Sequence, residues 1–115
     1  MADMTKKVLI MPKTQRIALI AYPGAQQAAL LGMVDMFAFA SRFAADGTVF
    51  VTSIHASPGE VERADVLILP PALGVSDELA GDDRFRAALQ ELRATGTLIT
   101  SVCAGSLLLA DCGLL

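Results

Sequence analysis

Residues 97–110 read TLITSVCAGSLLLA, an apolar segment that runs through Cys103 into a second apolar segment. Residues 97–102 are rich in β-branched side chains and predict a strand, whereas residues 106–110 predict a helix. The small residues Ala104 and Gly105 allow the backbone to turn sharply between them, as in nucleophile elbows. Backbone N–H groups at the start of such a helix would stabilise negative charge on the sulfur or on an oxyanion. Cys103 is therefore the candidate functional residue, and the alternative is a structural cysteine that packs in the core.

Three further strands are predicted upstream of this elbow. Residues 16–22 and 64–69 are near-continuous apolar runs, which are typical of parallel strands buried on both faces. Residues 48–54 are rich in β-branched side chains. Pro and Gly residues follow each of the three segments and end it.

Two helices are predicted between these strands. Residues 26–43 carry side chains for one helix face at three- and four-residue steps, namely Leu30, Met33, Val34, Phe37 and Ser41. A second helix has Ser76 as its candidate N-cap, Asp82 and Asp83 as part of its solvated start, and Thr95-Gly96 at its end. Its expected inner face consists of Phe85, Ala88, Leu89 and Leu92.

The resulting order, β-α-β-β-α-β-α, predicts an α/β fold with a mostly parallel sheet and helices on both faces, a flavodoxin-like three-layer sandwich. Ligands of such sheets bind beyond the carboxyl ends of the strands, which is where Cys103 lies. We expect residues 1–15 to be a poorly ordered N-terminal extension and residues 16–115 to be one domain. Because the last helix closes with Gly113-Leu114-Leu115, we expect this domain to be truncated at its C-terminal side.

Composition excludes several classes of function. The formal net charge of −3 argues against a nucleic-acid-binding surface on this chain. The apolar stretch at residues 28–40 contains Gly32 and Asp35 and is too short to span a membrane. The two cysteines, Cys103 and Cys112, show no metal-ligand spacing, so we expect reduced thiols, no metal, no cofactor and a cytoplasmic protein. Two further residues are assigned structural positions. Cys112 is expected in the core, and Asp35 is expected to face solvent or to pair with a charge such as Arg42.

Three segments carry a resemblance to a known family. They are IALIAYPGAQQAALLGMVDMF at residues 17–37, VLILPPALG at residues 66–74, and TLITSVCAGSLLLADCGLL at residues 97–115. Together they resemble the DJ-1/PfpI (class I glutamine amidotransferase-like) superfamily, and most closely the amino-terminal domain of AraC-type transcription regulators. The resemblance implies a ligand site formed by Cys103, Ala104, Gly105, Pro71 and Ala72.

The chain departs from the catalytic members of that superfamily. Those members place a carboxylate on the first helix segment to hydrogen-bond the nucleophile. In the related isocyanide hydratases it falls five residues beyond the Pro-Gly pair, and here that position is Ala29. Met33 replaces the proline that follows Gly32 in the family pattern. The single histidine, His55, ends the second predicted strand, where the family has no catalytic base. Cys103 therefore has no acid or base that the sequence reveals, and an activated thiol needs one of them.

The resemblance leaves three functions open. The first is a ligand-sensing, dimerising domain without catalytic activity, which binds a small molecule, forms a homodimer and reaches DNA only through a C-terminal domain absent from this chain. The alternative is a cysteine-dependent amidase, hydratase or glyoxalase-like enzyme that uses Cys103 as nucleophile. The third is a degenerate stand-alone fragment with no activity. The sequence does not decide whether the chain is an enzyme.

Overall fold

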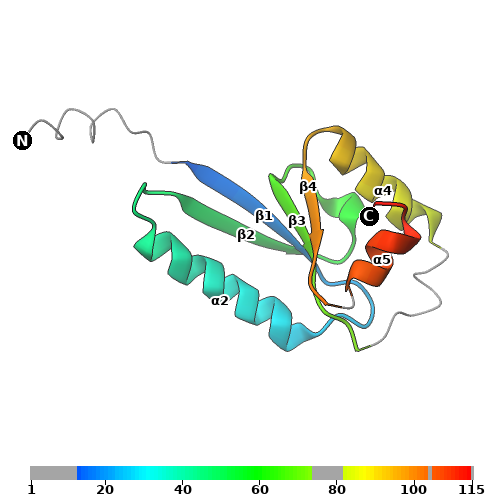
Figure 1. The fold of residues 1–115 in the computed structure, drawn as a ribbon, viewed down its shortest axis with the longest axis horizontal. Coiled ribbons are helices and arrows are strands. Elements are labelled where there is room, and N and C mark those ends of the chain that lie inside the picture. The colour runs from blue at the N-terminus through cyan, green and yellow to red at the C-terminus, as the bar shows by residue number, and fades with distance from the viewer. Residues whose placement is uncertain (1–12, 74–81, 104, 115) are drawn as a thin grey trace, which may run out of the picture.

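A four-stranded parallel sheet forms the centre of the molecule (Figure 1). The structure is a computed structural model that describes residues 13–73, 82–103 and 105–114. The strands are β1 (Thr14–Ile20), β2 (Val49–His55), β3 (Val66–Leu69) and β4 (Leu98–Ser101), and their order in the sheet is β2-β1-β3-β4. Every pair of neighbouring strands is parallel. The predicted α/β class is confirmed.

Helices cover both faces of this sheet (Figure 1). On one face lies α2 (Gln27–Phe43), and on the other lie α4 (Asp83–Ala94) and α5 (Gly105–Asp111). A short 3₁₀ helix, η1 (Pro58–Glu60), connects β2 toward β3 and contacts α4. The element order agrees with the predicted β-α-β-β-α-β-α, and the three layers are those of a flavodoxin-like sandwich. No helix among the described residues is long and apolar enough to cross a membrane.

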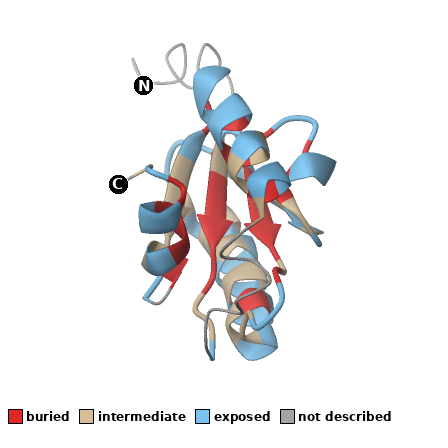
Figure 2. Ribbon diagram, turned by 90° about the vertical axis from the view of Figure 1, so that its right-hand side faces the viewer, coloured by how far each residue is buried: buried red, intermediate tan, exposed pale blue. Residues whose placement is uncertain are grey.

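The central strands owe their uniform apolar character to burial on both faces. In β1, residues 17–20 are all buried, and in β3 residues 67–69 are. The edge strand β2 instead alternates half-buried and exposed residues over most of its length. Figure 2 shows the buried residues concentrated in the middle of the sheet and on the helix faces turned toward it. Strand position in the sheet thus explains the sequence pattern of each strand.

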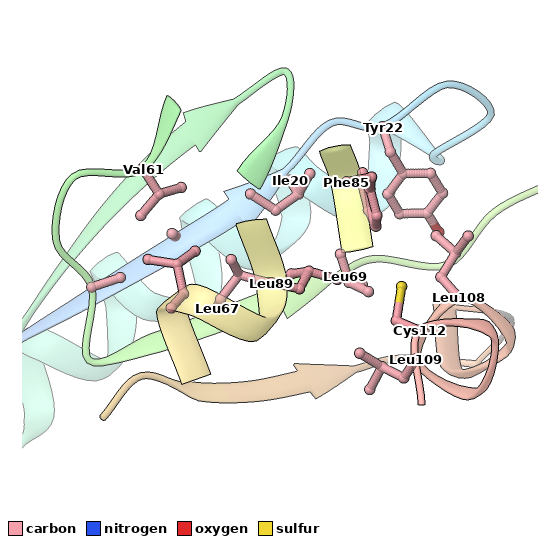
Figure 3. Close-up of a cluster of buried hydrophobic side chains, with 13 residues drawn as sticks. Ile20, Tyr22, Val61, Leu67, Leu69, Phe85, Leu89, Leu108, Leu109 and Cys112 are labelled. Carbon is pink, nitrogen blue, oxygen red and sulfur yellow. The ribbon is translucent and has the colours of Figure 1, made fainter. Parts of the chain in front are cut away.

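The larger part of the core lies under α4 and α5 (Figure 3). Alternate residues of β1 and β3 point to this face, and the inner faces of the two helices meet them. Burial of the apolar side chains stabilises this layer by about 25 cal/mol for each Å² removed from water. The cluster includes Ile20, Tyr22, Leu67, Leu69, Phe85, Leu89, Leu92, Leu108, Leu109 and Cys112.

The other face of the sheet packs against α2. The predicted inner face of this helix is confirmed, because Leu30 is buried and Met33, Val34 and Phe37 pack against Ile17, Leu19 and Ile68. The polar member of the predicted face, Ser41, donates a hydrogen bond to Phe37 O (2.9 Å) and accepts one from Phe50 N (2.8 Å). Ser41 therefore ties the last turns of α2 to β2.

Some boundaries differ from those predicted. Strand β1 begins at Thr14, two residues before the predicted start of this strand, because Thr14 and Gln15 pair with Val49 and Phe50 of β2. Residues 1–12 of the expected extension lie outside the described residues. So does Ser76, the predicted N-cap. The N-cap of α4 is Asp82, whose carboxylate accepts hydrogen bonds from the second and third amides of the helix.

Candidate functional site

Cys103 lies in a sharp turn between β4 and α5. Its φ is +50°, and it is the one residue other than glycine with positive φ among the described residues. This left-handed conformation costs of order 1–3 kcal/mol and persists only where the surrounding structure holds it. Val102 N donates to Leu69 O (2.9 Å) just before the turn, and Ser106 N donates to Cys103 O (3.0 Å) just after it. Cys103 thus has the backbone geometry of a nucleophile elbow, and its side chain is exposed.

Gly105 allows α5 to approach the end of β3. A Cβ at this position would lie 2.6 Å from Leu69 O and 2.9 Å from Pro70 O. Both atoms belong to the backbone, so they cannot rotate away as a side chain would. The third residue of the Cys-Ala-Gly sequence must therefore be glycine for the elbow to form. The middle residue, Ala104, lies outside the described residues.

Hydrogen bonds join the loops that follow β1 and β3. Tyr22 Oη donates to the carbonyl of Pro70, and Gln26 N donates to Pro71 O (2.8 Å). Leu73 N donates to Gly24 O (3.0 Å), and an isolated antiparallel bridge joins Ala25 to Ala72. The residues at the end of β3 are therefore hydrogen-bonded both to the start of α2 and to the segment before the elbow.

The sheet register brings the predicted ligand-site residues to one edge. Leu69 pairs with Ser101, so Pro71 and Cys103 both follow two residues later on neighbouring strands. Pro71 and Ala72 are half-buried, Cys103 is exposed and Gly105 is buried. Pro71, Ala72, Cys103 and Gly105 therefore lie at the carboxyl end of the β3–β4 pair, where parallel sheets bind ligands.

No described side chain is placed to activate the thiol. Cys103 Sγ makes no hydrogen bond to any described residue. His55 ends β2, and β2 and β4 are opposite edges of the sheet. With three strand spacings between them, the two strands are about 14 Å apart. The imidazole Nε2 of His55 is instead 2.8 Å from Ser53 Oγ, so its partner belongs to its own strand.

Neither Ala29 nor Asp35 supplies an acid to the Cys103 thiol. Ala29 lies in the first turn of α2 and is half-buried. Its methyl group cannot hydrogen-bond a thiol. Asp35 lies further along α2 and is exposed, as expected. Among the described residues it forms no ion pair with Arg42. The two salt bridges within the described part of the chain join Arg86 to Asp83 and to Asp111 (3.8 Å each).

Burial governs the chemistry of two further groups near the elbow. Cys112 is 4% exposed and belongs to the core cluster, as expected, and burial raises the pKa of its thiol. Burial also raises the pKa of the Tyr22 phenol, which keeps its hydroxyl a donor toward Pro70. Both cysteines are free thiols. Cys103 is thus the accessible one of the pair.

A cavity that we did not predict from the sequence also lies at the carboxyl end of the sheet. It has a volume of about 400 Å³. It lies beyond β1 and β2, next to the start of α4, and Cys103 is not among its walls. The signal in the sequence was the pair of turns that follow these strands, Pro23-Gly24 and Ser57-Pro58-Gly59, because ligands bind beyond strand ends. The lining residues are Pro23, Ala56, Ser57, Pro58, Gly59, Asp82, Arg84 and Phe85. No group of three His, Cys, Asp or Glu residues in the described part of the chain is placed to hold a metal ion.

Comparison with solved structures gives the chain's relatives. A protein of Vibrio parahaemolyticus provisionally assigned as a transcriptional regulator matches with a TM-score of 0.71 at 20% identity, over 90% of this chain and 63% of its own. DJ-1beta of Drosophila melanogaster matches with a TM-score of 0.61 at 21% identity, over 90% and 62%. A ThiJ/PfpI family protein of Pseudomonas syringae matches with a TM-score of 0.68 at 26% identity, over 90% and 48%.

These matches support the predicted superfamily. The chain fits the DJ-1/PfpI superfamily in fold, and it spans between about half and two thirds of the length of the three proteins. No protein-family model matches the chain, and no curated protein sequence does.

Proposed function

We propose that this chain is the ligand-sensing and dimerising part of an AraC-type transcription regulator and that it does not catalyse a reaction. The observation that carries the proposal is an elbow without catalytic partners. Cys103 has positive φ and an exposed side chain, yet no described residue hydrogen-bonds its sulfur. A weakly nucleophilic thiol needs a base, an acid or a metal beside it, and Ala29 stands where related enzymes carry a carboxylate.

The elbow is suited to capture of a small molecule. A ligand that reached Cys103 would also meet Pro71 and Ala72, which follow the neighbouring strand. The loop that holds Pro71 is hydrogen-bonded to Gln26 at the start of α2. Binding would therefore favour one arrangement of α2 over another, and a ligand can shift an equilibrium only by such differential contacts.

Contact with DNA is assigned to a C-terminal domain outside this chain. The formal net charge of −3 argues against a phosphate-binding surface on this chain. The similarity in fold to the Vibrio parahaemolyticus protein assigned as a regulator is consistent with a sensing role for this chain and DNA binding by another domain. A reducing compartment, the cytoplasm, suits a chain with two free thiols.

One observation favours the alternative, a cysteine-dependent amidase, hydratase or glyoxalase-like enzyme. Strained backbone at a single exposed residue is typical of catalytic nucleophiles, and Cys103 has a φ of +50°. This alternative requires an acid or base from outside the described residues.

Two measurements distinguish the sensing domain from the cysteine-dependent enzyme: substrate turnover and labelling of the Cys103 thiol. Wild type and Cys103→Ser are incubated with methylglyoxal and with small amides, and the loss of methylglyoxal and the release of ammonia are followed. We expect equal background rates for both proteins. Turnover that disappears in Cys103→Ser would overturn the proposal in favour of the enzyme.

The labelling arm uses iodoacetamide and intact mass. Cys103 is exposed and Cys112 is buried, so the folded chain should take one label and the unfolded chain two. Nitrogen-containing metabolites are then screened for protection of Cys103, with Ala72→Trp as the variant that obstructs the site and Ala87→Trp on exposed α4 surface as its control. Protection that Ala72→Trp abolishes and Ala87→Trp preserves supports the sensing role, whereas no protection by any compound in the screen argues against it.

A further inference from the structure

Helix α2 has a second apolar face that points away from the sheet. Successive residues of an α-helix are about 100° apart, which places Phe39 diametrically opposite the inner side chains of α2. Phe39 is 64% exposed and Phe43 68%, and their rings lie 4.6 Å apart between centroids. Met36 lies about 60° from Phe39 around the helix, on the side of Phe43, and is also more than half exposed. We call Gly32, Met36, Phe39 and Phe43 the outer face of α2.

This face is unusual for a solvated surface. Single exposed apolar side chains are common, but a contiguous group marks a contact site. Figure 1 shows α2 as the outermost layer on its side of the sheet. The outer face also contains Gly32, in the interior of the helix, where glycine costs roughly 0.5–1 kcal/mol relative to alanine. Nothing lies within 4 Å of the point that a Cβ of Gly32 would occupy, so no contact within the described chain requires glycine there.

We propose that the outer face of α2 packs against the same face of a second copy, with the two helices antiparallel about a two-fold axis near residue 37. The inference rests on the dimerising part of the proposed function and names the surface that performs it. It does not depend on the identity of the ligand.

Charge complementarity favours a second copy of this chain as the partner and an antiparallel arrangement of the two α2 helices. Asp35 and Arg42 border the outer face on the same side, are exposed, and lie seven residues, or about 10 Å, apart along the helix. Neither forms a salt bridge within the described chain. In the antiparallel pair, Asp35 of each copy comes within about 5 Å, measured along the helix axis, of Arg42 of the other copy. In a parallel pair the two-fold axis would run along the helices, so Asp35 and Arg42 of the two copies would lie on opposite sides of the contact and could not pair.

Side-chain size agrees with the same arrangement. In the antiparallel pair, Gly32 of one copy falls between Phe39 and Phe43 of the other along the axis. A glycine provides the space that two aromatic rings need for close approach. A lipid surface is a poorer occupant, because membrane-surface helices carry several Lys and Arg residues and α2 carries only Arg42.

The expected dimer is of moderate affinity. A standard stable interface buries about 800 Å² on each partner, more than one helix of four to five turns supplies by itself. Association should therefore depend on concentration in the micromolar range, which sedimentation velocity measures directly.

The test is a charge exchange across the proposed two-fold axis. Asp35→Arg and Arg42→Asp should each weaken association about tenfold, because each replaces two attractive contacts by two repulsive ones. The double variant should restore the dissociation constant to within about threefold of wild type, since it re-forms both pairs in the reverse sense. Arg93→Asp, on the exposed surface of α4, is the matched control and should leave association unchanged. Circular dichroism verifies that each variant is folded.

Two further variants locate the interface independently of charge. Phe39→Glu should abolish the dimer, and Leu107→Glu, on the exposed side of α5, should not. A dimer that resists Phe39→Glu, or single charge variants that the double variant does not rescue, would overturn this inference while leaving a dimerising module intact. A wild-type chain that stays monomeric at all concentrations would overturn both the inference and the dimerising part of the proposed function.

Discussion

The close packing of the elbow against β3 predicts a large penalty for the smallest possible side chain at Gly105. In Gly105→Ala the new methyl carbon would lie 2.6 Å from Leu69 O and 2.9 Å from Pro70 O. Neither carbonyl can move freely, because Leu69 O accepts from Val102 N and Pro70 O accepts from the Tyr22 hydroxyl. The variant must therefore displace α5 or break these hydrogen bonds.

The magnitude follows from two opposing effects. Overpacking of this kind costs about 1–3 kcal/mol, and contact with two fixed carbonyls places Gly105→Ala at the upper end of that range. The higher helix propensity of alanine offsets up to about 1 kcal/mol of this loss in a helix interior, and less at the first helical residue, where Gly105 lies. The net loss is about 2 kcal/mol of unfolding free energy, or roughly 10 °C in melting temperature for a domain of this size.

Thermal and urea unfolding followed by circular dichroism measure this loss. Gly59→Ala is the matched control, because its methyl group would meet only Ser57 Oγ, at 3.8 Å. Its effect should stay within about 0.5 kcal/mol. If Gly105→Ala proved as stable as wild type, the tight approach of α5 to the end of β3 would be wrong, and with it the elbow geometry of Cys103.

Two further predictions concern hydrogen bonds that position the same edge of the sheet. Tyr22→Phe should lower stability by about 1–3 kcal/mol, because it leaves the buried carbonyl of Pro70 without its donor. Burial raises the pKa of Tyr22, so its stabilising contribution is complete below the unfolded-state pKa of about 10 and is lost as pH rises through the higher folded-state value. Unfolding between pH 9 and 12 should therefore depend less on pH in Tyr22→Phe, and an unchanged pH dependence would contradict this assignment. Asp82→Ala should cost about 1 kcal/mol through loss of the N-cap of α4, whereas Asp83→Ala, which removes a longer exposed contact to Arg86, should cost less than half of that in urea unfolding.

Local patterns in the sequence were sufficient for the types of the elements. The three- and four-residue steps of Leu30, Val34 and Phe37 place them on one side of α2, because helical geometry alone brings such residues together. The small residues after Cys103 indicated a sharp turn for the same local reason. Strand ends were less well predicted, since they depend on partners: β1 extends to Thr14 because β2 is there to pair with it.

For the candidate site, the sequence anticipated where its residues lie, whereas their role in ligand binding stays a prediction. Cys103, Pro71 and Ala72 come to one edge of the sheet, as the resemblance implied, because β3 and β4 are neighbours in register. The cavity beyond β1 and β2 was not predicted. Its walls come from the segments after β1 and β2 and from the start of α4, which are far apart in the sequence, and nothing in any one segment shows which others it will meet.

The sequence by itself determined the α/β class, the buried stripe of each helix and the position of the elbow, because these follow from interactions between residues a few positions apart. Only the tertiary structure decided the strand order, in which His55 ends one outermost strand and Cys103 follows the other, so that β2 supplies no base to the thiol. It also decided that Gly105 must be glycine, since the carbonyls it meets belong to the last residue of β3 and to the residue after it, more than thirty positions away. Likewise, Phe39 is apolar in the sequence whether it faces the core or solvent, and only packing of the opposite side of α2 on the sheet leaves it exposed.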